Sequence, residues 1–221
     1  MEKRSKKLEK YNSVIKVDVN GEVYQRVVFN MPVIQLGAKK PQKAERTPSE
    51  SLSAEEVRER AQRRAKTKVK DYIRTNTDLK YFVTYTLSPE KIKDRYDEKV
   101  VYSSIRNWLA NRVKLKGLKY ILVPELHEDD AWHFHGFTNK NLKWNYGISV
   151  VKYPRSERAS KKAINYTISY IGKDNNKFNG RYYLHSNNLL EPTKIYDNKD
   201  FDEEDGYCFE IKNGLMVKII D

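Results

Sequence analysis

Three of the four histidines in this 221-residue chain lie within nine residues of one another: His127, His133 and His135. His133 and His135 are two positions apart in a run that predicts a β-strand, so their side chains lie on the same face. Glu125 and His127 share a face of the preceding predicted strand in the same way. Two imidazoles and a carboxylate on one patch are typical of a three-ligand metal site with open coordination positions. We therefore predict a divalent-metal site formed by Glu125, His133 and His135.

The turn between these two strands decides whether Glu125 belongs to the site. In an antiparallel hairpin, Glu125 faces the same way as the histidines only if the turn contains an odd number of residues, about three or five. An even number would place the carboxylate on the other face and remove the site. The alternative is a pair of surface histidines on an exposed strand, because a His-x-His sequence alone is common. His127 is a reserve ligand, or a residue beside the ligands.

A second group of reactive side chains lies further along the chain. Tyr166, Tyr170 and Lys173 are spaced i, i+4 and i+7 in a segment that predicts a helix over residues 156–173, so all three share one helical face. A phenol has a pKa of about 10 and is a poor nucleophile at neutral pH. A nearby ammonium and a metal ion on a substrate phosphate would both make it more reactive. The alternative is that the helix packs its tyrosines onto the sheet, although its other side already offers apolar residues for that contact.

Three segments of the chain resemble the motifs of HUH endonucleases, and they occur in the family's order. They are FVTYTLSP at Phe82–Pro89, HFHG at His133–Gly136 and YTISYIGK at Tyr166–Lys173. They look most like those of the rolling-circle replication initiators (Rep proteins) of small phages and plasmids. The Tyr-x-x-x-Tyr-x-x-Lys spacing is similar to the two-tyrosine class, which includes the gene A proteins of small isometric phages. Two positions depart from the family pattern, since Tyr85 replaces a small aliphatic residue and Ser169 replaces a lysine that many relatives carry.

This resemblance implies an enzyme that nicks single-stranded origin DNA by metal-dependent tyrosine transesterification. The two histidines and Glu125 would hold Mg²⁺ or Mn²⁺ on the scissile phosphate, although imidazole ligands by themselves favour Mn²⁺ or Zn²⁺. Tyr170 or Tyr166 would attack, giving a 5′-phosphotyrosine link and a free 3′-OH, and the other tyrosine would rejoin strands at termination. We expect Tyr170 to act first, because it begins the Tyr-x-x-Lys unit found even in single-tyrosine relatives. Lys173 would neutralise the phosphate or lower the pKa of a tyrosine.

Hydrophobic periodicity and turn signals predict the elements that position these groups. The fold class is α+β, with a central five-stranded antiparallel sheet flanked by helices, as in HUH and RRM-like folds. Strands are expected at residues 80–87, 120–126, 132–137, 146–153 and 181–185, and helices at 54–75, 97–115 and 156–173. Three regions are expected: a basic N-terminal extension (1–52), the endonuclease domain with its leading helix (53–190), and a C-terminal acidic loop and edge strand (191–221). The extension would include a disordered start (1–10), a hairpin with a two-residue turn at Asn20 and Gly21, and a linker (37–51).

The charge of the chain points to a polyanionic partner. It has 43 basic and 30 acidic residues, a net charge of +13, and 16 tyrosines on which bases could stack. Residues 1–80 hold 20 basic and 11 acidic side chains, so most of the excess lies there. We predict that the helix at 54–75 presents a basic rail to DNA, unless this rail is an ordinary solvated helix face. The residues expected to contact nucleic acid are Arg58, Arg63, Arg64, Lys66, Lys68 and Tyr85.

Composition also excludes some classes of protein. The single cysteine, Cys208, excludes disulfide frameworks and thiolate metal clusters. No apolar run approaches the roughly 20 residues that cross a bilayer, and no signal-peptide core follows Met1, so we expect a cytoplasmic protein without a membrane partner. Because the chain has no P-loop motif, we expect it to work with a helicase and a polymerase of the host or of the mobile element.

Two alternatives remain open at this point. The first is an HUH relaxase or single-strand transposase, which would use the same chemistry in another setting. The second is a non-catalytic module that binds single-stranded nucleic acid and stacks bases on Tyr81, Tyr85 and Phe134 of the sheet.

Overall fold

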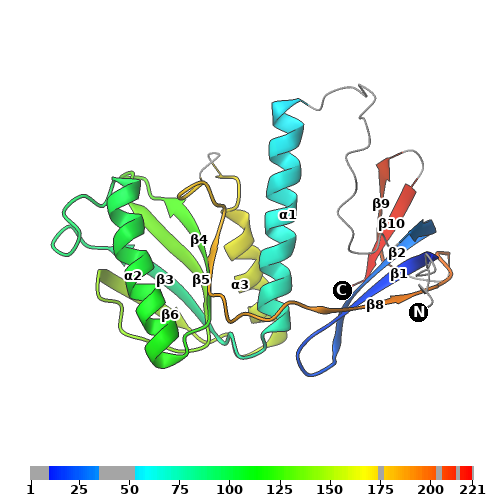
Figure 1. The fold of residues 1–221 in the computed structure, drawn as a ribbon, viewed down its shortest axis with the longest axis horizontal. Coiled ribbons are helices and arrows are strands. Elements are labelled where there is room, and N and C mark those ends of the chain that lie inside the picture. The colour runs from blue at the N-terminus through cyan, green and yellow to red at the C-terminus, as the bar shows by residue number, and fades with distance from the viewer. Residues whose placement is uncertain (1–9, 35–52, 174–176, 203–205, 213–214, 221) are drawn as a thin grey trace, which may run out of the picture. The chain divides into compact units, whose positions relative to one another are not determined.

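The computed structural model describes residues 10–34, 53–173, 177–202, 206–212 and 215–220. The chain divides into two compact units: residues 1–51 together with 192–221, and residues 52–191 (Figure 1). The second unit contains a five-stranded antiparallel sheet with helices on both faces, which confirms the predicted fold class. The expected disordered start and most of the expected linker fall outside the described residues.

The first unit is a sheet that draws its strands from both ends of the chain. Its strands are β1 (Lys10–Val17), β2 (Val23–Ile34), β8 (Thr193–Asp197), β9 (Tyr207–Lys212) and β10 (Leu215–Ile220), in the order β8-β1-β2-β10-β9. Sequence patterns treat the two terminal regions as separate, whereas here they form one sheet. Instead of one edge strand after the acidic loop there are two, which form a hairpin, and β8 was not expected at all. These pairings join residues far apart in sequence, so no local signal announces them.

The hairpin at Asn20 and Gly21 forms, but not with a two-residue turn. Gly21 has a positive φ of 82°, whereas Asn20 does not have the positive φ that such a turn needs. The loop instead runs from Asp18 to Glu22, and the Asp18 amide donates a hydrogen bond to the Glu22 carbonyl. The Asp18 side chain accepts hydrogen bonds from the amides of both Asn20 and Glu22, which stabilises this wider loop.

The second unit has the strand order β6-β3-β5-β4-β7, and every neighbouring pair is antiparallel. Its strands are β3 (Tyr81–Leu87), β4 (Tyr120–Leu126), β5 (Trp132–Thr138), β6 (Gly147–Lys152) and β7 (Leu184–His185), and its helices are α1 (Ala54–Thr75), α2 (Glu98–Lys116) and α3 (Glu157–Ser169). The fifth strand, expected at 181–185, is reduced to two residues. The helix expected at 156–173 ends four residues early, at Ser169.

Local capping explains where the first two helices begin and end. Ser53 and Glu56 form the capping box expected from the sequence, each side chain bonding the other's backbone amide. The Asp97 carboxylate accepts hydrogen bonds from the first amides of α2. Gly117 ends α2 in the left-handed conformation, with a φ of 61°, which glycine adopts at little cost.

The sheet of the second unit buries both faces, and strand alternation sorts its residues between them. One face packs on α2, with Tyr85, Phe134 and Leu122 in the buried cluster. The other face packs on α1 and α3 through Phe82 and Phe137. Figure 1 shows α2 on one side of this sheet and α3 on the other. The candidate site occupies the part of the second face that the helices leave open.

Candidate metal and tyrosine site

The turn between β4 and β5 has the odd length that the site requires. It contains five residues, from His127 to Ala131, and the two strands pair so that Glu125 lies directly opposite His133. His135 pairs with Val123, two positions further along the same face. Residues that pair directly across an antiparallel ladder point to the same side of the sheet. Glu125, His133 and His135 therefore share one face, as predicted.

Two threonines on β3 hold the imidazole rings, and sequence reasoning missed them. Thr84 pairs with His135 and Thr86 with His133 on the strand next to β5. The Thr84 hydroxyl lies 3.1 Å from Nδ1 of His135, and the Thr86 hydroxyl lies 3.5 Å from Nδ1 of His133. A partner on one ring nitrogen fixes the ring's orientation and leaves the other nitrogen for a metal ion. The signal was present in FVTYTLSP, where the two threonines alternate at the same period as the two histidines.

The Glu125 carboxylate connects the histidines to the lysine of the last motif. One of its oxygens lies 2.7 Å from Nε2 of His135, and the other accepts a hydrogen bond of 2.9 Å from the Lys173 ammonium. The Glu125 side chain is only 13% exposed, so these charged groups interact with little screening by water. This arrangement brings together residues from β4, β5 and the turn after α3.

The two histidines are held in the neutral form that binds metal ions. Burial lowers the pKa of His133, and the neighbouring His127 and His135 lower it further. Burial also lowers the pKa of His135, although its hydrogen bond to Glu125 acts in the opposite direction. A neutral imidazole with one nitrogen held by a threonine and a carboxylate beside it are the donors that Mn²⁺ or Zn²⁺ accepts. The residues present therefore fit the divalent cation that the resemblance implies.

The two candidate nucleophiles pack directly against this group. The Tyr170 ring stacks flat on His135, with 4.5 Å between ring centroids and 9° between planes. The Tyr166 ring meets both of them edge-on, 5.6 Å from His135 and 5.0 Å from Tyr170. Tyr166 is 45% exposed, whereas Tyr170 is half-buried. The second alternative for these tyrosines, packing as routine sheet contacts, thus applies to their rings, but both rings pack on the candidate metal ligands.

The end of α3 differs from the prediction that placed both tyrosines and the lysine on one helix. Only Tyr166 lies within α3, since Tyr170 is the residue that caps its C-terminus and Lys173 follows in a separate turn. Gly172 makes this possible with a φ of 88°, and a Cβ at that position would lie 2.4 Å from the side chain of Gln62 on α1. The turn nevertheless holds the Lys173 ammonium 5.4 Å from the centre of the Tyr170 ring.

The environment of Tyr170 keeps its phenol protonated. Burial raises the pKa of Tyr170 well above its usual value, and its hydrogen bond with Tyr166 and the negative charge of Glu125 raise it further. Lys173 does not reverse this effect, because its ammonium is paired with Glu125. A decrease of this pKa would require positive charge that the amino acids of the site do not supply by themselves.

A second set of possible metal ligands shares His133 with the first. The ligand atoms of His127, Asp129 and His133 all lie within 4.8 Å of one another. The His127 ring stacks on His133 with 4.4 Å between centroids, and Asp129 also pairs with Arg95 at 2.7 Å. His127 and Asp129 are exposed and belong to the β4–β5 turn, whereas Glu125 and His135 are held within the strands. His127 thus lies where a reserve ligand would lie, beside His133.

A groove leads away from these residues between β6 and α3. It has a volume of about 780 Å³, and His135, Thr84 and Tyr166 line one end of it. Its other lining residues are Phe82, Val150, Lys152, Tyr153, Pro154, Arg155, Ala159, Lys162 and Ala163. Three of them are basic and none is acidic, and aromatic rings and apolar side chains form the rest. Such a surface suits a single nucleic-acid strand, with phosphates on the cations and bases on the rings.

The predicted nucleic-acid contact at Tyr85 is wrong. Its side chain is only 1% exposed and lies between Trp144 and Trp108 under α2, with the Trp144 ring stacked on it at 4.5 Å. Strand alternation explains the error, because Thr84 and Thr86 face the site and the residue between them must face the other way. Phe134 is fully buried on the same face. The alternative of a sheet that stacks bases on these rings therefore fails.

The basic residues of α1 remain candidates for DNA contact, with one exception. Arg58 and Arg63 form exposed ion pairs with glutamates on the same helix, and Arg64 is also exposed. Lys66 is half-buried. Lys68 is held by Glu191 and lies over the Tyr72 ring, so it is part of a local cluster rather than of an open rail.

Comparison with known proteins supports the class that this site indicates. Residues 80–175 match the family model of the ORF2-type replication-associated proteins. The matched segment contains Glu125, both histidines, both tyrosines and Lys173, whereas α1 and the terminal sheet lie outside it. Over this segment the chain is similar to replication-associated proteins, and the similarity supports a rolling-circle replication initiator as its class. No curated protein and no solved structure matches the chain.

The same class fits the composition of the helices. Within the described part of the chain, no helix is both long enough and apolar enough to cross a membrane.

Proposed function

We propose that this protein is a rolling-circle replication initiator that nicks single-stranded DNA at an origin by tyrosine transesterification. The observation that carries the proposal is the convergence of two phenols, an ammonium, two neutral imidazoles and a carboxylate at one end of a basic groove. Routine packing would explain any one of these contacts. It does not explain why Tyr166, Tyr170 and Lys173 all meet the face that carries Glu125 and His135.

The chain's own residues divide the work of this reaction. Glu125, His133 and His135 would hold Mn²⁺ or Mg²⁺, which supplies positive charge to a bound phosphate when it is present. The Tyr170 oxygen attacks the phosphorus, the bond from phosphorus to the 3′-oxygen breaks, and that oxygen leaves as a 3′-OH after it gains a proton. Tyr170 loses its own proton in the same step, so the reaction balances without any cofactor being consumed. Lys173 lies close enough to neutralise the phosphate.

A covalent link keeps the energy of the broken bond, so the reaction can run in reverse. Tyr166 lies beside Tyr170 and faces the groove, where a second strand end can reach it. We propose that Tyr166 carries out the exchange that rejoins strands at termination.

The groove supports single-stranded DNA as the substrate. Its cations and rings continue from His135 and Tyr166 without an acidic side chain among its lining residues. Neutralising Lys152, Arg155 and Lys162 to glutamine should weaken binding of a single-stranded oligonucleotide. It should also reduce the dependence of affinity on salt by about 0.7 for each phosphate that no longer meets a cation.

The proposal is tested with a pool of end-labelled single-stranded oligonucleotides and Mn²⁺. The wild-type chain should form a covalent protein–DNA adduct, visible after denaturing electrophoresis, and mass spectrometry of the adduct identifies the attached tyrosine. The Tyr166→Phe/Tyr170→Phe double variant should form none. Tyr153→Phe is the matched control, because it removes a phenol from the same groove without touching the cluster. Unchanged cleavage by the double variant, or by the wild type in excess EDTA, would refute the mechanism.

A further inference from the structure

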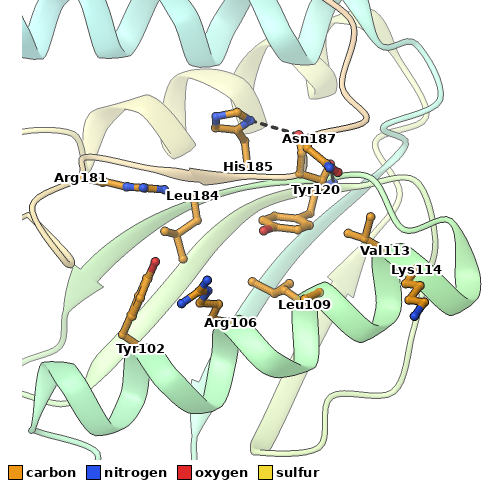
Figure 2. Close-up of a pocket in the computed structure, with 12 residues that line it drawn as sticks. Tyr102, Arg106, Leu109, Val113, Lys114, Tyr120, Arg181, Leu184, His185 and Asn187 are labelled. Atoms are coloured by element: carbon orange, nitrogen blue, oxygen red, sulfur yellow. Dashed lines mark hydrogen bonds between the residues drawn. The ribbon is translucent and has the colours of Figure 1, made fainter.

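A second pocket lies on the opposite face of the sheet from the candidate site. It has a volume of about 620 Å³ and opens between α2 and the β7 edge (Figure 2). Its floor includes Leu109, Val113 and Leu184, which belong to the cluster under α2 or pack against it. The pocket exists because β7 is only two residues long, so the sheet does not extend far enough to cover this side of α2.

The walls of this pocket are basic. Arg106 and Lys114 come from α2, and Arg181 comes from the segment before β7. Figure 2 shows Arg106 on the helix facing Arg181 across the hollow. Within the described residues, no carboxylate lines the pocket and none of these three cations forms an ion pair. Such a concentration of uncompensated positive charge is stabilised by an anionic ligand.

Two tyrosines add a feature that a simple anion does not need. Tyr102 rises from α2 and the Tyr120 ring lies on the sheet above Leu109, so aromatic surface lies next to the cations (Figure 2). Burial raises the pKa of Tyr120 to about 12, so its hydroxyl is protonated at neutral pH and can donate a hydrogen bond. An aromatic and apolar floor with cations on its walls matches a planar base joined to a phosphate. An acidic peptide would use the cations but not the rings.

From this arrangement we infer that the pocket between α2 and β7 binds a nucleoside phosphate, with the base on the tyrosine and leucine side chains and the phosphate on Arg106 and Arg181. Its volume lies within the range of about 300–1,000 Å³ that small-ligand pockets occupy. The ligand can be one nucleotide of a DNA strand or a free nucleotide, since both have this chemistry. The inference does not depend on cleavage, because the pocket shares no residue with the metal and tyrosine site.

The test uses the full-length chain and a change that alters charge without removing a packed side chain. Ala110 is exposed, lies on α2 and lines the pocket, so Ala110→Glu places a carboxylate among the cations. Asn111→Glu is the matched control, because it adds the same charge at an exposed position of α2 outside the pocket. The probes are fluorescein-labelled oligothymidylate, followed by anisotropy, and thymidine 5′-monophosphate, followed by calorimetry. Thermal unfolding verifies that both variants remain folded.

If the pocket binds a DNA strand, Ala110→Glu should weaken oligothymidylate binding at least tenfold, while Asn111→Glu changes it less than twofold. Arg106→Gln/Arg181→Gln should then reduce the salt dependence of binding by about 1.4, or 0.7 for each phosphate contact. If the ligand is a free nucleotide, only thymidine 5′-monophosphate binding should respond to Ala110→Glu. The inference is overturned if neither probe responds, or if a hexaglutamate peptide alone binds in a manner sensitive to Ala110→Glu.

Discussion

His135 lies at the centre of the described part of the site. Its ring lies between the Thr84 hydroxyl and the Glu125 carboxylate, and its face is covered by Tyr170. The proposed ligand and nucleophile are therefore parts of one packed cluster. A change that loosens the ring alters metal binding and tyrosine position together. The threonines behind the rings are consequently the sharpest residues to test.

Thr84→Val/Thr86→Val should lower the affinity for Mn²⁺ by about 10- to 100-fold, the usual effect of removing partners behind a metal ligand. Valine keeps the shape and the strand propensity but loses the hydroxyls that hold both Nδ1 atoms. Isothermal titration with Mn²⁺ measures the change. Thr138→Val is the control, since its hydroxyl bonds the Lys140 carbonyl at the far end of β5. Equal Mn²⁺ affinity in the wild type and the double variant would contradict the assigned role.

Tyr85 gives a second prediction at this scale, because its burial excludes direct contact with a base. Tyr85→Ala should lower the free energy of unfolding by about 3 kcal/mol, as truncation of a buried aromatic ring does. Urea unfolding measures this loss. Tyr85→Phe should leave oligonucleotide affinity unchanged. A Phe variant that stays folded but binds DNA more weakly would show that the side chain reaches the surface.

Short irregular segments, rather than the helices themselves, determine the geometry of the site at the scale of elements. The five-residue β4–β5 turn sets the face of Glu125, and the turn after α3 places Tyr170 and Lys173. Gly136 in the HFHG segment shows how closely two of the strands approach. A Cβ there would lie 1.9 Å from the Ile121 carbonyl oxygen of β4. No rotamer relieves a clash with backbone.

Gly136→Ala should therefore lower the free energy of unfolding by about 2 kcal/mol or more, as overpacked sites do. It should also disturb the site, because β5 carries both histidines. Gly117→Ala provides the comparison: its position has a positive φ but open space, so it should cost only about 1 kcal/mol. Chemical unfolding of both variants decides the order. A smaller loss for Gly136→Ala would mean that the strands can separate easily at this point.

At the scale of the whole molecule, the structure changes the meaning of the net charge. The sequence places most of the +13 in residues 1–80, which suggests a basic arm separate from the active site. The two units divide it differently: residues 1–51 with 192–221 hold 15 basic and 14 acidic residues, whereas residues 52–191 hold 28 and 16. The acidic C-terminal segment offsets the basic N-terminal one within a single sheet. The positive charge thus belongs almost entirely to the unit that contains the site.

A fragment of residues 52–191 should accordingly keep the salt dependence of oligonucleotide binding seen in the full chain. Phosphate contacts set this dependence, and the terminal unit has almost no net charge to contribute. Anisotropy titrations at several salt concentrations measure the slope for both proteins. A fall in the slope of more than about 1.4, equivalent to two phosphate contacts, would return the terminal unit to the DNA interface.

The sequence alone determined those features that local patterns encode. The period of two in HFHG put the histidines on one face, the capping box at Ser53 started α1, and Gly117 ended α2. It also identified Tyr166, Tyr170 and Lys173 as a group, although they are not all on one helix. Local signals were reliable here because each depends on residues within a few positions of one another.

Only the tertiary structure decided which partners these residues have. Thr84 and Thr86 reach the histidines across a strand pair that separates them by about fifty positions. The face of Tyr85 became certain only once β3 was paired with β5. The sharing of one sheet by both ends of the chain, and hence the location of the charge, likewise depends on long-range pairing. Such pairings depend on the packing of the whole chain, which no single window of sequence contains.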